Sequence, residues 1–407
     1  MKPPYSLFQV TGIELEYMVV DRTTLQVRPI VDRLFERVTG AITSDVERGE
    51  VEWSNELVAH VVELKTARPT PDIPRFRGLF HSEVKAINRE LAALDAMLLP
   101  TAAHPFMDPF TETVIWPHEH NEVYALYNRI FDCRGHGWSN LQSMHLNLPF
   151  QDDAEFGRLH AALRVLLPLI PAISASSPLL DGQPTSWLDG RMQAYLHHQE
   201  RLPQLMGRLI PERAYTREAY TRTVFEPILA ALKPFDTEGV MDRHFANSRG
   251  AIARFDRGAI EVRVIDLQEC PMMDLAVAEV LVAVTRALVE GRLGDPEAFK
   301  DLPEEELLGV FTGVIRSGRA TPIAHPGLLA AMGLEGASTA GAMWEHLAAR
   351  VEQDLSQDAR KGISLILEHG SLAERILACT GNTPDRDRIV AVYRELADHL
   401  EADTFFA

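Results

Sequence analysis

The chain has 407 residues, 46% of them hydrophobic, so it is long and apolar enough to build a large core and is not an intrinsically disordered protein. Its formal net charge of −18 argues against binding to the phosphate backbone of nucleic acids. The cysteines at positions 133, 270 and 379 form no CxxC pair, which excludes a typical zinc motif and fits a reducing cytoplasm.

Two further features concern where the protein resides. The first residues, MKPPYSLFQV, contain no apolar segment of the kind found in signal peptides. The longest apolar stretch, residues 276–289, includes Glu279 and Arg286, so we expect a core helix there and not a membrane span. We therefore expect a cytoplasmic protein with small-molecule substrates, without a nucleic-acid or membrane partner. The oligomeric state stays open, with a homodimer as one option.

The first predicted strand, residues 8–21, carries two acidic residues in an otherwise apolar sequence, FQVTGIELEYMVVD. Glu14 and Glu16 are two positions apart, so their side chains point to the same face of the strand. Carboxylates held so close repel each other, and a divalent cation such as Mg²⁺ would relieve that repulsion. A solvent-facing edge of an antiparallel sheet would produce the same pattern, and this strand alone does not separate the two explanations.

The next segments alternate between helical and extended patterns. A short helix is predicted at 29–38, and a strand at 59–66 places Glu63 opposite its apolar neighbours. Apolar residues recur at helical spacing from 76 to 99, and a loop follows from 100 to 120. The loop ends in His118, Glu119 and His120, a combination that could bind a metal but is more typical of a solvated turn.

Three more strands are expected in the middle of the chain. The alternating segment 139–150, SNLQSMHLNLPF, puts His145 and Asn147 on one face. Residues 251–256 and 259–268 form a hairpin across Arg257-Gly258, with Glu261 and Arg263 on one face of the second strand. The remaining helices are predicted at residues 122–132, 154–178 (broken by Pro168 and Pro171), 191–207, 274–290, 304–315, 341–355, 364–377 and 387–402. Hairpin-type strands mixed with long helices favour the α+β class.

The polar groups on these strands favour one kind of chemistry. If the strands share one sheet, the side chains converge on its concave face. Several glutamates with one imidazole suit Mg²⁺ or Mn²⁺, and an arginine fork among them suits phosphate. That combination indicates phosphoryl transfer. Because the sequence has no GxxxxGK[ST] and no GxGxxG, ATP would be held by metals on a carboxylate-lined sheet. The residues concerned are Glu14, Glu16, Glu63, His145, Glu261 and Arg263.

The sequence resembles the bacterial carboxylate–amine ligases of the glutamate–cysteine ligase type. The resemblance rests on GIELEYMVVD, NELVAHVVELKT, HPFMDPF, SMHLNLPF, PAISASSPLLDG and above all GAIARFDRGAIEVRVIDLQE. These segments span residues 10–290, and the helical C-terminal third is less similar. The resemblance implies one catalytic domain over residues 1–407, with a sheet-containing core at 1–271 and a helical part at 272–407 packed on it.

The resemblance also implies a fold, a reaction and a set of site residues. The fold is that of the glutamine synthetase catalytic domain, a curved, mainly antiparallel sheet that forms a funnel with helices outside. Members use ATP and Mg²⁺ to phosphorylate a carboxylate, usually the γ-carboxylate of glutamate, and an amine such as cysteine then displaces phosphate to form an amide. Carried onto this sequence, the metal ligands are Glu14, Glu16, Glu63, His145 and Glu261. Arg263 contacts the transferred phosphoryl group, and Glu56 belongs to the metal shell or the amine site.

One strand departs from the family pattern. Many members have a strand of the type His-Val-His-Val-Gly, whereas this chain has Ser143, Met144, His145, Leu146 and Asn147. One histidine is thus replaced by serine and the glycine by asparagine. The difference leaves the identity of the amine open, and that of the acid as well.

Two arginines outside the main set are further candidates. Arg191 follows a turn and is predicted to bind a substrate α-carboxylate, and Arg254 is predicted to bind the nucleotide. The alternative for each is an arginine on a surface helix or at a strand end.

Three other functions remain as alternatives to the ligase. An ATP-dependent phosphotransferase of the guanidino-kinase kind needs the same metals but no amine site. A metal-dependent amidohydrolase needs an activated water, which histidine-poor ligands do not favour. A regulatory module would have no reason to retain mutually repelling acids.

Overall fold

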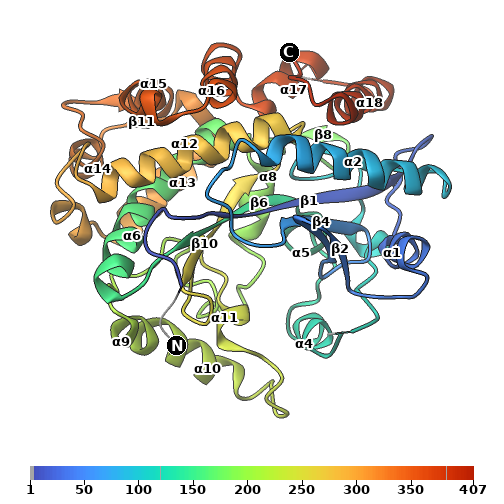
Figure 1. Cartoon of the computed structure of the whole chain (residues 1–407), viewed down its shortest axis with the longest axis horizontal. Helices are drawn as coiled ribbons and strands as arrows, with labels where there is room; N and C mark the ends of the chain where they lie inside the picture. Colours follow the sequence, from blue (N-terminus) through green and yellow to red (C-terminus); the bar gives the residue numbers. More distant parts are fainter. Residues whose placement is uncertain (1–3, 120, 382) are drawn as a thin grey trace.

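The centre of the molecule is an antiparallel sheet, seen in Figure 1 in a computed structural model that describes residues 4–119, 121–381 and 383–407. The strand order is β2-β3-β4-β1-β6-β10-β9, with β5 paired to the second half of β1, and the path ends at β2 and β9 without closing. The strands are β1 (Gly12–Asp21), β2 (Asp45–Arg48), β3 (Val51–Asn55), β4 (Val61–Thr66), β5 (Ala96–Leu99), β6 (Ser143–Pro149), β9 (Ala251–Arg254) and β10 (Ala259–Asp266). The predicted α+β class with an antiparallel sheet is confirmed, whereas the funnel stays a prediction.

Helices cover one face of this sheet. The side chains of Ile13, Leu15 and Tyr17 on β1 are fully buried on that face, and in Figure 1 helices α2 (Phe76–Ala92) and α12 (Pro271–Val289) lie above it. Helix α12 is apolar on nearly all sides because it lies between the sheet and the C-terminal helices. Among the described residues, no helix combines the length and apolar character that crossing a bilayer would need.

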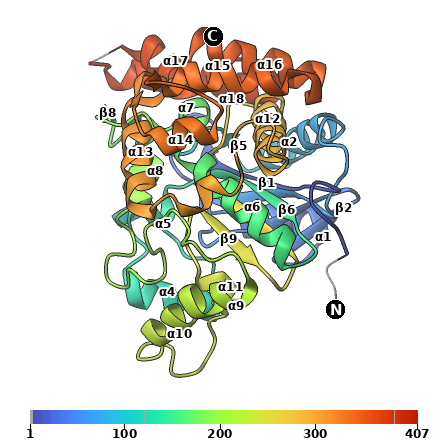
Figure 2. The same ribbon diagram turned by 90° about the vertical axis from the view of Figure 1, so that its left-hand side faces the viewer.

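The C-terminal helices form an outer layer on α12. Figure 2 shows this layer at one end of the molecule and a group of short helices at the other, with the sheet between them. Gly362 allows the close approach of α16 to α12, because a Cβ atom there would lie 2.4 Å from the Cβ of Ala276. The outer layer contains α15 (Ala340–Val351), α16 (Gln357–His369), α17 (Leu372–Thr380) and α18 (Arg386–Ala402), and α13 (Glu304–Ser317) and α14 (Pro326–Ala331) lie below it.

The other helices are α1 (Val31–Thr39), α3 (Pro109–Glu112), α4 (Asn121–Phe131), α5 (His136–Ser139), α6 (Asp153–Leu166), α7 (Pro171–Ser174), α8 (Gly190–Tyr195), α9 (Arg217–Tyr220), α10 (Glu226–Leu232) and α11 (Arg243–Ala246). Of these, α4, α5, α8 and α11 contribute residues to the open face of the sheet, whereas α6 packs against α12. Two small ribbons pair β7 (Leu179–Leu180) with β8 (Gln183–Pro184) and β11 (Pro322–Ile323) with β12 (Ser338–Thr339).

Three predictions of secondary structure were wrong. The helix expected over 76–99 ends at Ala92, because Asp95 adopts a left-handed conformation (φ 54°) and the next residues pair with β1 as β5. The helix expected over 191–207 stops at Tyr195 and continues as turns. Strands β2 and β3 were not anticipated; they form a hairpin around Gly49, whose φ of 77° suits a residue without a side chain.

Candidate active site

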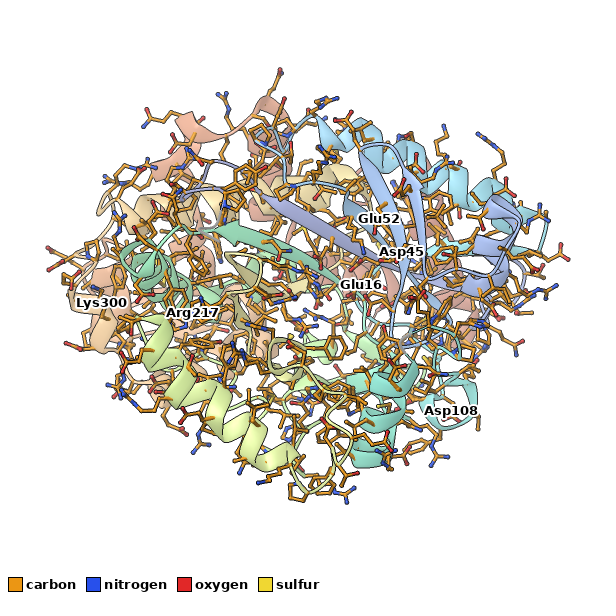
Figure 3. The ribbon with its side chains drawn as sticks, turned by 60° about the horizontal axis from the view of Figure 1, so that its bottom comes forward. Glu16, Asp45, Glu52, Asp108, Arg217 and Lys300 are labelled. Atoms are coloured by element: carbon orange, nitrogen blue, oxygen red, sulfur yellow. The ribbon has the colours of Figure 1, made fainter. Side chains whose placement is uncertain are left out.

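A cavity of about 1140 Å³ lies on the open face of the sheet. Strands β1, β3, β4, β6, β9 and β10 form its acidic wall, and side chains from α4, α5, α8 and α11 line the other side. In Figure 3, Glu16 lies near the middle of the molecule beside Asp45 and Glu52, whereas Arg217 and Lys300 lie far out. Every predicted site residue lines this cavity: Glu14, Glu16, Glu56, Glu63, His145, Arg191, Arg254, Glu261 and Arg263.

Strand register brings the acidic residues together. Glu14 lies directly opposite His145 on β6, and Glu16 lies opposite Glu63 on β4. Glu261 on β10 is the partner of Asn147 on β6. Because side chains directly opposite each other on one sheet face lie within about 5.5 Å at their Cβ atoms, pairing alone assembles the cluster.

The closest contact in the cluster joins Glu14 and His145. Nδ1 of His145 donates to Oε2 of Glu14 at 2.9 Å. Burial opposes charge on both side chains, but their mutual attraction outweighs it and lowers the pKa of Glu14 to about 2. For His145, burial alone would lower the pKa. The charge of Glu16 and the hydrogen bond to Glu14 outweigh burial and raise the pKa of His145 to about 9. The pair is therefore a carboxylate and an imidazolium at neutral pH.

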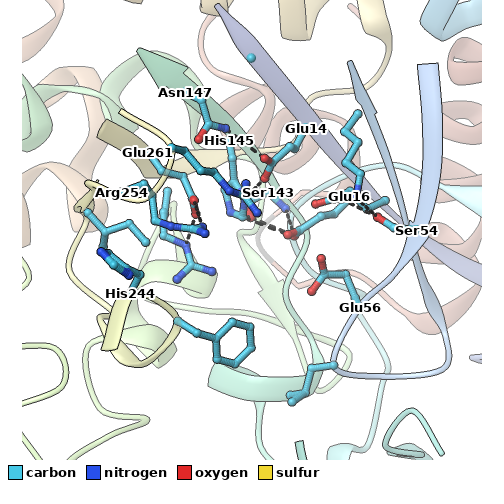
Figure 4. A pocket seen from close by; sticks show the side chains of 18 of the residues that line it. Glu14, Glu16, Ser54, Glu56, Ser143, His145, Asn147, His244, Arg254 and Glu261 are labelled. Atoms are coloured by element: carbon cyan, nitrogen blue, oxygen red, sulfur yellow. Dashed lines mark hydrogen bonds and ion pairs between the residues drawn. The ribbon is translucent and has the colours of Figure 1, made fainter. Parts of the chain in front are cut away.

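Glu63 and Glu56 have the opposite balance. Burial, followed by the charge of Glu14, raises the pKa of Glu63 to about 7, although Lys65 lies 3.2 Å away. Partial burial, with the charges of Glu16 and Glu63, raises the pKa of Glu56 well above its ordinary value. Figure 4 shows the Glu56 carboxylate pointing toward Glu16. The cluster thus holds more carboxylates than its own cations neutralise.

Two sets of side chains could each hold a metal ion. Glu14, Glu63 and His145 form one set, Glu16, Glu56 and Glu63 form the other, and in each the ligand atoms lie within 4.8 Å of one another. Oxygen-rich sets with unsatisfied negative charge fit Mg²⁺ or Mn²⁺. Both ring nitrogens of His145 are already hydrogen-bonded, so coordination would require it to release a proton and one of those bonds.

Glu261 is in neither set. Its carboxylate lies 3.3 Å from Nη1 of Arg254 and 3.2 Å from Nε of Arg263, so it joins two guanidinium groups. These two arginines line the cavity beside the metal-binding sets. The predicted metal role of Glu261 stays a prediction, and it would require the carboxylate to turn from at least one arginine.

His118 and Glu119 are not among the described residues that line the cavity. Nε2 of His118 lies 3.0 Å from Oδ2 of Asp32, and its ring contacts Trp116 edge-on. His120 lies outside the described residues.

Comparison with known proteins decides the family. The model of glutamate–cysteine ligase family 2 matches residues 10–395. The chain belongs to this family. The resemblance seen in the sequence motifs is therefore confirmed, and the protein is a ligase that forms carbon–nitrogen bonds.

Related proteins and solved structures match this ligase over nearly its whole length. An uncharacterised protein of Archaeoglobus fulgidus is 30% identical over 401 residues, covering 97% of this chain and 99% of its own. The crystal structure of a glutamate–cysteine ligase from Francisella tularensis matches with a TM-score of 0.60 at 12% identity, over 98% of this chain and 90% of that one. A bifunctional glutathione synthetase from Pasteurella multocida matches with a TM-score of 0.55 at 14% identity, over 97% and 53%. At such low identities these structures establish the shared fold alone.

Several cavity residues of the ligase escaped the sequence analysis. Lys65 follows Glu63 by two positions, so strand alternation could have revealed it, whereas Ser54 lies on the unanticipated β3. The wall opposite the sheet is aromatic, with Tyr124 and Tyr127 from α4 packed against Phe245 from α11. No sequence pattern marks these aromatic residues, because they come from separate short helices.

Proposed function

We propose that this ligase uses ATP to phosphorylate a substrate carboxylate and that an amine then displaces the phosphate, which yields an amide, ADP and phosphate. The acid is glutamate, activated at its γ-carboxylate, and the amine is cysteine or another amino compound. One observation carries the proposal: two metal-binding sets that share Glu63 lie in the same cavity as Arg254 and Arg263. The Francisella enzyme of the same fold was crystallised with AMP, which supports an adenine nucleotide as the phosphoryl donor.

The residues of the cavity fit the steps of this reaction. Mg²⁺ or Mn²⁺, held by Glu14, Glu16, Glu56, Glu63 and His145, would neutralise charge on the nucleotide phosphates. Arg263 donates from its planar fork to the phosphoryl group during transfer, and Arg254 binds the nucleotide phosphates. Glu261 bridges the two arginines and holds both forks in place. The amine attacks the acyl phosphate, the carbon–oxygen bond breaks, and the amine proton passes to a nearby carboxylate or to solvent.

The decisive experiment measures ADP and phosphate release over a matrix of amino acids and amines with Mg·ATP. We expect stoichiometric release of both products only when acid and amine are present together. Phosphate released from an acid labelled with ¹⁸O in its carboxylate should carry one ¹⁸O atom, because the carboxylate oxygen that is phosphorylated leaves with the phosphate. ADP formed with a stable phosphorylated product would instead indicate a phosphotransferase, and amide hydrolysis without ATP would indicate an amidohydrolase.

Two variants control the assay. Glu63→Gln removes the carboxylate common to both metal-binding sets and should abolish product release. Glu47→Gln makes the same change at an exposed position on β2 and should leave product release unchanged.

A further inference from the structure

Strand β6 carries a row of polar side chains that all bond to the two carboxylates of β1. Ser143, His145 and Asn147 occupy alternate positions, so they share the open face of the sheet. Figure 4 shows Asn147 and His145 directed at Glu14 and Ser143 directed at Glu16. In this segment, serine and asparagine stand where the resemblance seen in the sequence implies histidine and glycine.

Ser143 binds Glu16 twice. Its backbone N–H donates to Oε2 of Glu16 at 2.8 Å, and its hydroxyl Oγ lies 2.9 Å from the same oxygen. Oγ also lies 2.9 Å from Nε2 of His145. A hydroxyl has one proton, so it donates to the carboxylate and accepts from the imidazole N–H. A continuous chain of donors therefore runs from Glu14 through His145 and Ser143 to Glu16.

Asn147 secures the second oxygen of Glu14. Its Nδ2 donates to Oε1 at 3.0 Å, while Oε2 receives the bond from His145. Gly12 lies opposite Asn147 on β1, and a Cβ atom at that glycine would lie 3.1 Å from the Cβ of Asn147, so the missing side chain leaves room for the amide. A flipped amide would point its oxygen at the carboxylate, so the amide orientation is set by Glu14.

We propose that Ser143 and Asn147 are positioning residues that hold the Glu16 and Glu14 carboxylates in place for metal binding. Carboxylates that repel one another would otherwise turn apart, and gathering them again would weaken the binding of the cation. A carboxylate ligand that is hydrogen-bonded by a second layer of residues keeps its orientation, and loss of such a partner typically lowers metal affinity about 10- to 100-fold. This inference rests on the metal use that forms part of the proposed function.

The test is Mn²⁺ binding, followed by the electron paramagnetic resonance signal of free Mn²⁺ in the absence of nucleotide and substrates. We expect Asn147→Ala and Ser143→Ala each to raise the Kd for Mn²⁺ about 10- to 100-fold. Ser143→Thr retains the hydroxyl and should bind Mn²⁺ as the unchanged protein does. Two matched controls, Asn121→Ala and Ser82→Ala, alter exposed side chains that bond to backbone carbonyls outside the cavity and should have no effect.

Thermal unfolding of the same variants separates positioning from a purely structural role. If the role of the two residues is purely structural, Asn147→Ala and Ser143→Ala would have a lower Tm. At temperatures below the unfolding transition, however, their Kd for Mn²⁺ would equal that of the wild-type protein. That outcome would overturn the inference while leaving the proposed function intact. The same holds if both variants match the wild-type protein in Kd and in Tm. If Asn147→Ala does not fold, Asn147→Gly gives the residue common in the family strand and serves the same comparison. If the wild-type protein itself binds no Mn²⁺, both this inference and the proposed function are overturned.

Discussion

Arg191 and Asp266 form an ion pair with both side chains almost fully buried. Nε of Arg191 donates to Oδ1 of Asp266, and the exposed fractions of the two side chains are 3% and 0%. Nη1 of Arg191 also donates to the backbone carbonyl of Arg263 at 3.3 Å. Arg191 thus lines the cavity and is also bonded to the strand that carries Arg263, and its binding of a substrate carboxylate stays a prediction.

The first prediction follows from this pair. Arg191→Met should lower the free energy of unfolding by about 3–5 kcal/mol, because Asp266 would remain buried without its counter-charge. Urea denaturation would measure the loss. If Arg191 acts mainly on a substrate carboxylate, the variant would instead unfold at the same urea concentration and show only a raised KM for the acid.

Arg263→Lys tests the phosphoryl contact. Lysine keeps the positive charge but loses the planar fork, so kcat should fall about 100- to 1000-fold with little change in stability. Steady-state ADP release on the best pair of substrates is the measurement. The matched control is Arg208→Lys, which alters an exposed ion pair with Glu305 away from the cavity. Turnover near that of the unchanged enzyme would exclude Arg263 as the phosphoryl-binding residue.

Glu63 should matter more to metal binding than any other carboxylate of the cluster. It belongs to both metal-binding sets, whereas Glu56 belongs to one. We therefore expect Glu63→Gln to weaken the binding of Mn²⁺ at both sets and Glu56→Gln to weaken it at only one set. Titration calorimetry with MnCl₂ would give the number and affinity of sites for each variant. If the two variants gave identical titration curves, the assignment of Glu63 to both metal-binding sets would be wrong.

Lys65 should stabilise the acidic wall in the absence of metal. Its Nζ lies 3.2 Å from both Glu52 and Glu63 and donates to Ser54 at 2.9 Å. Lys65→Met should cost about 1.5–3 kcal/mol of stability, since bonds to charged groups of this kind are lost. Mg²⁺ should restore part of the loss by supplying the missing positive charge.

Thermal unfolding of Lys65→Met with and without MgCl₂ would test that expectation. Lys361→Met, at an exposed position on α16, is the control. A Tm for Lys65→Met that is low but insensitive to Mg²⁺ would indicate that the lysine stem stabilises by packing alone.

His104 should make the protein sensitive to acid. Nε2 of its buried ring donates to the carbonyl of Leu25 at 2.7 Å, Nδ1 accepts from the N–H of Phe106, and burial lowers its pKa to about 4. The unfolded chain binds a proton near pH 6.5, whereas the folded protein does so only near pH 4. The stability it contributes is therefore complete above pH 6.5 and is lost as the pH falls toward 4, by up to about 3 kcal/mol.

Urea denaturation between pH 7 and 4 would test this prediction with His104→Gln, whose amide retains a donor for Leu25. In His104→Gln, the slope of the unfolding free energy against pH should be smaller by about 1.4 kcal/mol per pH unit, which corresponds to the uptake of one proton fewer on unfolding. His197→Gln replaces a histidine that is 61% exposed and should leave the slope unchanged. Equal slopes for all three proteins would contradict the assigned role of His104.

Much of the site could be predicted from the sequence because strand geometry is local. A spacing of two places Glu14 beside Glu16, and Glu261 beside Arg263, on one face whatever the rest of the chain does. The long helices near the C-terminus were predicted for the same reason, since their apolar spacing depends only on nearby residues. These periodicities, with the family motifs, were sufficient for the fold class and the family.

Tertiary structure alone decided which side chains face each other. Strand pairing sets Glu16 against Glu63 and Glu14 against His145, and register between distant strands leaves no local signal. Pairing with β1 also turned the end of a predicted helix into β5, because hydrogen bonding to a neighbouring strand outweighed the helical spacing. The charge states of Glu63 and His145 arise from burial and from partners on other strands, so they depend on packing that no sequence pattern contains.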